Sequence, residues 1–194
     1  MTPNLDRAQA AQDPFPHFRA PGLIEPGLAG ATLAWLRDEA DWRLRVEDFY
    51  EQHEIDLLGA TPPAPVADLV SDAFVGGVRQ ALERLLYDAG PLELVGACAH
   101  RLTAGQTIRI HNDHIGEEET HRLLVQFNEG WSADRGGLLM IFAGDAPETL
   151  VDVIMPEHGS GFGFEISARS HHAVSTVRSG ERFTVVYTFR RSVA

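Results

Sequence analysis

The sequence has little cysteine, few basic residues and no long apolar run. Its one cysteine, Cys98, cannot form a disulfide framework or a cysteine-rich zinc site within one chain. With 16 basic against 28 acidic residues the formal net charge is -12, so neither nucleic acid nor an anionic membrane surface is an expected partner. No segment approaches the roughly 20 apolar residues of a membrane span, and the first residues contain no signal-peptide run. These absences predict a cytoplasmic protein whose metal, if any, is held by imidazole and carboxylate.

The chain has enough apolar material to form a core. At 194 residues and 44% hydrophobic, residues 1–194 are predicted to form a single domain. Within it, residues 1–20 are polar and broken by prolines, which predicts a loose tail. Residues 21–91 are predicted to be mainly helical support, and residues 92–191 to be the β core.

Two segments carry apolar side chains at helical spacing. They are residues 28–42 and residues 66–87, and the second is expected to be interrupted at Gly76 and Gly77. Two helices followed by a run of strands predict an α+β, mainly β, domain whose helices brace one face of the sheet.

Beyond residue 92 the sequence changes to short apolar and β-branched runs separated by Gly, Asn, Asp and Pro. This texture predicts an antiparallel sandwich or barrel of about eight strands. The strands are expected at residues 92–102, 107–113, 121–128, 137–143, 151–155, 161–166, 171–177 and 182–190.

A His-x-Asp pair lies on the second of these strands. Because side chains alternate along a strand, His111 and Asp113 are expected to project to the same face. A pair alone is weak support for a metal site, but His171 and His172 lie near the end of the chain, where a later strand could return beside the first. Two histidines and one carboxylate would leave positions open on an iron ion.

The last predicted strand begins with an arginine. Arg182 and Thr184 are two residues apart and therefore face the same side. A guanidinium can grip a carboxylate with two parallel hydrogen bonds, and a neighbouring hydroxyl can add a third. A dicarboxylic keto acid would fit such a clamp.

The order and spacing of these residues resemble a known family. The residues are His111-x-Asp113, Asn128-x-x-Trp131, Gly136-Gly137 and His172-x-Val174-x-x-Val177-x-x-Gly180-x-Arg182-x-Thr184. This series, over about residues 95–190, is similar to the prolyl-hydroxylase-like branch of the iron(II)/2-oxoglutarate-dependent dioxygenase superfamily.

The resemblance implies a double-stranded β-helix of the jelly-roll type. It implies that His111, Asp113 and His172 hold Fe(II), because the spacing to Arg182 selects His172, and that Arg182 and Thr184 bind 2-oxoglutarate. The implied reaction consumes O2, converts 2-oxoglutarate to succinate and CO2, and hydroxylates an unactivated C–H bond, with ascorbate as a candidate reductant.

One position departs from the family pattern. Relatives often carry a co-substrate-binding tyrosine near Leu102, and leucine cannot replace its hydroxyl group. Arg109, on the expected inward face of His111, and Gln126, close to Asn128, are the candidates for an additional contact to 2-oxoglutarate.

The substrate is less well defined by the sequence. Residues 45–58, which contain Tyr50 and His53, form either a lid over the barrel or an exposed linker, and the acidic patch that begins at Glu117 would favour a cationic substrate. A small molecule or amino-acid-like substrate is expected. The alternatives are a peptidyl side-chain hydroxylase of the prolyl-hydroxylase type, a non-catalytic β-barrel binding or sensing module, and a cupin-like enzyme that needs no keto acid.

Overall fold

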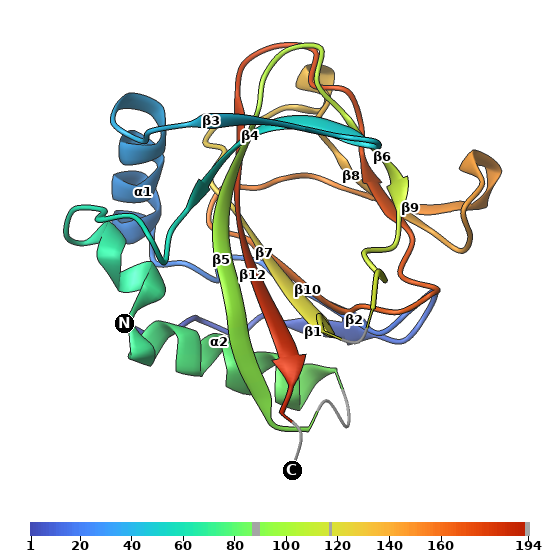
Figure 1. Cartoon of the computed structure of the whole chain (residues 1–194), viewed down its shortest axis with the longest axis horizontal. Helices are drawn as coiled ribbons and strands as arrows, with labels where there is room; N and C mark the ends of the chain where they lie inside the picture. The colour runs from blue at the N-terminus through green and yellow to red at the C-terminus, as the bar shows by residue number, and fades with distance from the viewer. Residues whose placement is uncertain (87–89, 117, 193–194) are drawn as a thin grey trace.

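The computed structural model describes residues 1–86, 90–116 and 118–192. Within them, twelve strands form one antiparallel sheet that curls back on itself (Figure 1). The strand order is β1-β2-β10-β7-β12-β5-β4-β6-β11-β8-β9, with β3 paired to β4. An ion pair between Arg19 of β2 and Asp152 of β9 links strands from the two ends of this order. The fold is mainly β and of the jelly-roll type, as predicted.

The eight predicted strands are all present, most of them with shifted ends. β5 has the predicted bounds, whereas the strand predicted at residues 107–113 ends at His111. The strands are β1 (Gln9–Ala11), β2 (His17–Ala20), β3 (Arg43–Glu47), β4 (Tyr50–Asp56), β5 (Leu92–Leu102), β6 (Ile108–His111), β7 (His121–Gln126), β8 (Leu139–Phe142), β9 (Leu150–Ile154), β10 (Gly161–Glu165), β11 (His172–Val174) and β12 (Arg182–Arg191).

Two α-helices lie in the described part of the chain, α1 (Pro26–Asp38) and α2 (Asp72–Leu85). The predicted interruption at Gly76 and Gly77 is wrong, because α2 runs through both. The break falls earlier, at Ser71, whose side chain caps α2 by accepting a hydrogen bond from the backbone N–H of Phe74 (3.3 Å). Short 3-10 helices are η1 (Val66–Val70), η2 (Ala133–Arg135) and η3 (Pro147–Thr149). Neither α-helix has the length and apolar character that crossing a bilayer requires.

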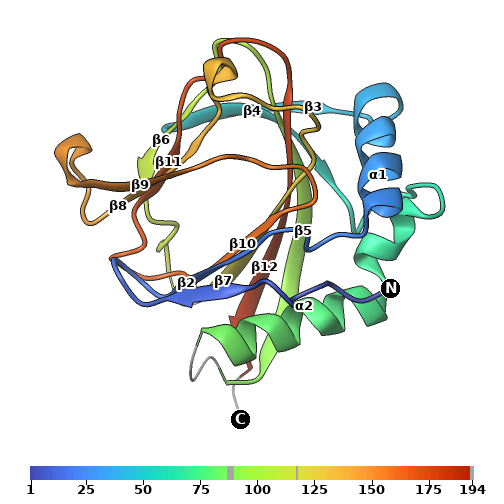
Figure 2. The same cartoon turned by 180° about the vertical axis from the view of Figure 1, so that it is seen from behind.

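β12 shows how the sequence divides the two faces of the sheet. Its alternate residues Phe183, Val185, Tyr187 and Phe189 are buried in the main core. That core also includes residues of α1 and α2, which lie along one side of the curled sheet (Figure 2). The other alternate residues, Arg182, Thr184, Val186 and Thr188, line an internal cavity. The strand therefore carries a core face and a site face.

The predicted loose tail is ordered. β1 and β2 lie within residues 1–20, and β2 pairs with β10 in the register Phe18–Gly163. Phe15 and Phe18 are completely buried. The prolines suggested a tail, but the partner of β2 lies about 145 residues further along the chain, and no local pattern reveals such a pairing.

The prediction for residues 21–91 is correct for the helices and wrong for the segment between them. β3 and β4 form a hairpin in which β4 pairs with both β5 and β6. Most residues of the hairpin are polar, because one side of β4 faces the cavity and β3 is exposed along its whole length. A strand without apolar alternation gives no period-two signal.

Candidate metal and co-substrate centre

Three candidate ligands converge at the mouth of the curled sheet. His111 ends β6 and His172 begins β11, and the two are directly paired in the register of these strands. Asp113 follows β6 in a left-handed backbone conformation (φ 61°), which aspartate tolerates better than most residues. Each of its two carboxylate oxygens lies 3.3 Å from the Nε2 atom of one histidine. A turn thus brings the pair together, whereas strand alternation was predicted to do so.

Hydrogen bonds fix the orientation of both imidazoles. The Nδ1 atom of His111 lies 2.9 Å from the carbonyl oxygen of Arg109, and that of His172 lies 2.8 Å from the carbonyl oxygen of Ser170. Since a carbonyl can only accept, both Nδ1 atoms must donate, and both Nε2 lone pairs point toward Asp113 in the neutral rings. The ligand atoms of the three residues lie within 4.8 Å of one another. Three electron-pair donors this close together fit a bound cation.

The carboxylate of Asp113 has a partner that the sequence did not indicate. Arg122 of β7 forms an ion pair with Asp113 (2.9 Å) and a second one with Glu119 (2.7 Å). Burial alone would raise the pKa of Asp113, but the positive charge of Arg122 opposes this effect, and the pKa is held well below its usual range. The carboxylate is therefore ionised and ready to bind a cation. Alternation along β7, which puts Arg122 on the face of Gln126, was the available signal.

Arg182 lies further inside, with its charge unpaired. Its Nε donates to the carbonyl oxygen of Gly137 (2.8 Å) and an Nη donates to the Thr184 hydroxyl (2.7 Å). No carboxylate of the described residues lies within ion-pair distance of it, and burial lowers its pKa to about 10. A buried guanidinium with only neutral partners favours an anionic ligand. The position fits a carboxylate of 2-oxoglutarate.

Thr184 and Gln126 form a hydrogen-bonded chain that leads away from Arg182. The Thr184 hydroxyl donates to Oε1 of Gln126 (3.0 Å), and Gln126 does not line the cavity. The proton of Thr184 is thus already used, so these two residues orient the guanidinium rather than add free donors to the cavity. Both were predicted to contact the co-substrate directly.

The remaining motif residues support the start of β12. Asn128 accepts from the backbone N–H of Phe183 (2.7 Å) and donates to its carbonyl (3.0 Å). Trp131 donates to the carbonyl oxygen of Gly136 (2.9 Å), and a Cβ atom on Gly136 would meet Thr176 O at 2.0 Å. The motif spacing therefore reflects how Arg182 is held in place.

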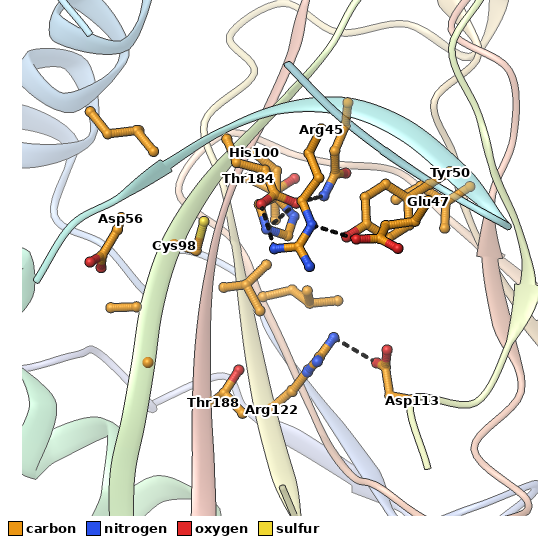
Figure 3. Close-up of a pocket in the computed structure, with 18 of the residues that line it drawn as sticks. Arg45, Glu47, Tyr50, Asp56, Cys98, His100, Asp113, Arg122, Thr184 and Thr188 are labelled. Atoms are coloured by element: carbon orange, nitrogen blue, oxygen red, sulfur yellow. Dashed lines mark hydrogen bonds and ion pairs between the residues drawn. The ribbon is translucent and has the colours of Figure 1, made fainter. Parts of the chain in front are cut away.

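The cavity connects these groups and has a volume of about 1570 Å³. Figure 3 shows Asp113 and Arg122 on one side of it and Arg45, Tyr50 and His100 on another. Burial, assisted by the Glu54 carboxylate, raises the pKa of Tyr50 to about 12, so its phenol stays protonated.

Other predicted substrate-side and co-substrate residues fall elsewhere. His53 projects from the face of β4 opposite Tyr50 and does not line the cavity. The Arg109 side chain is exposed and outside the cavity, although its carbonyl orients His111. Glu117 lies outside the described residues, while its neighbours Glu118 and Glu119 line the cavity.

A curled antiparallel sheet that gathers two imidazoles and one carboxylate around one point is the arrangement of a non-haem iron oxygenase. A sequence model of the 2OG-Fe(II) oxygenase superfamily matches residues 97–190. Prolyl 3-hydroxylase sudestada1 of Drosophila melanogaster is 26% identical over 178 residues, covering 88% of this chain and 33% of that protein. The chain thus spans about a third of the length of this relative.

Two solved structures share the fold. One is a prolyl hydroxylase of Trichoplax adhaerens in complex with a hypoxia inducible factor oxygen degradation domain peptide fragment (TM-score 0.72, 13% identity, 90% of this chain and 83% of that one). The other is HygX of Streptomyces hygroscopicus with nickel, 2-oxoglutarate and hygromycin B bound (TM-score 0.61, 15% identity, 91% and 83%). Residues 97–190 are therefore similar to the 2OG-Fe(II) oxygenase superfamily, and the chain shares its fold with a solved prolyl hydroxylase.

Proposed function

We propose that this chain is an iron(II)- and 2-oxoglutarate-dependent dioxygenase, in which His111, Asp113 and His172 hold the iron and Arg182 binds 2-oxoglutarate. The observation that carries the proposal is a buried, unpaired guanidinium in the same cavity as two oriented imidazoles and an ionised carboxylate. A metal-binding module without 2-oxoglutarate would gain nothing from burying an unpaired arginine.

Each group has a distinct task in the proposed reaction. When bound, iron(II) and 2-oxoglutarate would activate O2, which would be the oxidant that hydroxylates a C–H bond while 2-oxoglutarate is converted to succinate and CO2. His111 and His172 present their Nε2 lone pairs, because their Nδ1 protons are held by backbone carbonyls. Arg122 keeps Asp113 ionised, and Arg182 orients the co-substrate through its distal carboxylate.

The substrate is an amino-acid-like C–H donor, either free or within a peptide. The volume of about 1570 Å³ accommodates 2-oxoglutarate together with a second molecule or a peptide side chain. The peptide alternative is supported by the name of the Drosophila relative and by the peptide in the Trichoplax complex, and the small-molecule reading by hygromycin B in HygX. Proline-containing peptides and free amino acids are therefore the substrates to compare first.

A reducing compartment fits the single free thiol, Cys98.

The test is succinate formation by the purified protein with iron(II), 2-oxoglutarate and these substrates. His172→Ala removes one ligand and should lower iron affinity and turnover about 100-fold or more. His171→Ala is the matched control, since the adjacent imidazole is not one of the three converging ligands. Arg182→Met should retain iron but lose 2-oxoglutarate binding. If His172→Ala bound iron and formed succinate like the wild type, the assignment of the centre would be overturned.

A further inference from the structure

A row of polar side chains crosses four neighbouring strands at the cavity wall, and all but the last of them line the cavity. The register pairs Glu54 of β4 with His100 of β5, His100 with Thr184 of β12, and Thr184 with Gln126 of β7. Directly opposed residues in a sheet have neighbouring side chains. Figure 3 shows His100 and Thr184 close together on this wall. His100 is thus a neighbour of the group that orients Arg182.

The imidazole of His100 has no hydrogen-bond partner among the described residues. Its one ion-pair contact among the described residues is with Oε1 of Glu54, 4.0 Å from Nε2, and 21% of the side chain is exposed. Glu54 itself is occupied, since it accepts from Gln52 (2.7 Å) and pairs with Arg45 (3.5 Å). A largely buried imidazole without a partner, facing a cavity, fits contact with a ligand.

The neighbouring groups indicate which ligand it would contact. The proton of Thr184 is used by Gln126, so this part of the wall has few free donors besides the remaining N–H groups of Arg182. A carboxylate bound by Arg182 has more lone pairs than a single guanidinium edge can satisfy. An N–H from His100, one strand away, would complete its hydrogen bonding.

We propose that His100 is a second contact for the carboxylate of 2-oxoglutarate that Arg182 binds. The inference rests on the proposed function, and it adds a residue that the sequence motifs do not include. Burial lowers the pKa of His100 to about 4, with Glu54, Arg122, Arg182 and Asp113 as the charged groups around it. A bound dianion neutralises Arg182 and favours the imidazolium, so binding should be accompanied by proton uptake.

Isothermal titration of 2-oxoglutarate into the iron-loaded protein without oxygen tests the contact, in two buffers of different ionisation enthalpy. His100→Leu should weaken 2-oxoglutarate about tenfold or more and leave iron affinity unchanged. His100→Gln keeps an N–H donor, so its affinity should stay within about threefold, but its proton uptake should disappear. Cys98→Ala, one row away on the same face of β5, is the matched control and should behave like the wild type.

The outcomes separate this inference from the proposed function. Wild-type affinity in His100→Leu would overturn the contact, and so would weaker binding with unchanged proton uptake, because a purely structural role would not involve the titrating imidazole. If the wild-type iron protein bound no 2-oxoglutarate, the proposed function itself would fail.

Discussion

At the residue scale, Arg122 is the least expected part of the centre. It approaches Asp113 from β7 and is held on its other side by Glu119. A guanidinium so close to the proposed metal site has a cost, because it repels a cation, but it keeps the carboxylate ionised in a buried place. The effect of Arg122 on the ionisation of Asp113 should be measurable in the pH dependence of metal binding.

We predict that Arg122→Met raises the pH at which iron is lost. Arg122 holds the pKa of Asp113 well below its usual range, so this carboxylate stays ionised and available to the metal as the pH falls through the usual aspartate range. Without Arg122 that pKa rises, and release should move up by roughly one pH unit.

Metal content after dialysis over a series of pH values measures this shift. Arg190→Met is the control, since Arg190 pairs with Glu93 at an exposed position on β12. An unchanged release midpoint in Arg122→Met would show that the ion pair does not set the ionisation of Asp113.

At the element scale, α2 shows where sequence patterns succeed and fail. Its apolar stripe predicts a helix correctly, but two adjacent glycines suggested a break that the structure does not have. Glycine lowers helix stability without ending a helix when the helix packs well. The two glycines also differ in a way that the sequence cannot show.

We predict opposite effects of alanine at these neighbouring positions. A Cβ atom at Gly76 would meet nothing within 4 Å, so Gly76→Ala should raise the free energy of unfolding by about 0.5–1 kcal/mol. At Gly77 it would lie 2.4 Å from Cδ of Pro3, so Gly77→Ala should displace the first residues and be no more stable than the wild type. Urea unfolding of both variants is the measurement, and an equal gain at Gly77 would contradict the packing of Pro3 on α2.

At the scale of the whole molecule, the excess of acidic over basic residues is also found among the residues that line the cavity. The overall charge is -12. Among the described lining residues, eight are acidic, namely Glu39, Asp41, Glu47, Glu54, Asp56, Asp113, Glu118 and Glu119, whereas four are arginines. We therefore expect the cavity to favour a substrate with a cationic group beyond the carbon that is oxidised.

We predict that Glu118→Lys weakens a cationic substrate and not a neutral one. Glu118 is exposed at the cavity, so the KM for a lysine-containing peptide should rise about threefold or more at low salt, and less at high salt. A matched peptide with norleucine should be unaffected, and Glu148→Lys, on the exposed η3, is the control variant. Equal KM values for both peptides in Glu118→Lys would remove the charge argument.

Several features were predictable because they depend on local pattern. The eight core strands follow from alternation and turn residues, and the motif spacing indicated His111, Asp113, His172 and Arg182. The single-domain organisation over residues 1–194 stays a prediction. Strands β1 to β4 were missed, because their partners are distant in sequence or their exposed residues lack periodicity.

The sequence by itself determined which chemical groups this protein carries. The candidate metal ligands, the single thiol and the arginine at the start of β12 can be read directly from residue type and spacing. Only the tertiary structure decided which groups surround them. The turn at Asp113, the approach of Arg122 and the position of His100 beside Thr184 arise from strands that pair across long stretches of chain. Such pairings depend on the packing of the whole sheet, and no segment of the sequence specifies them alone.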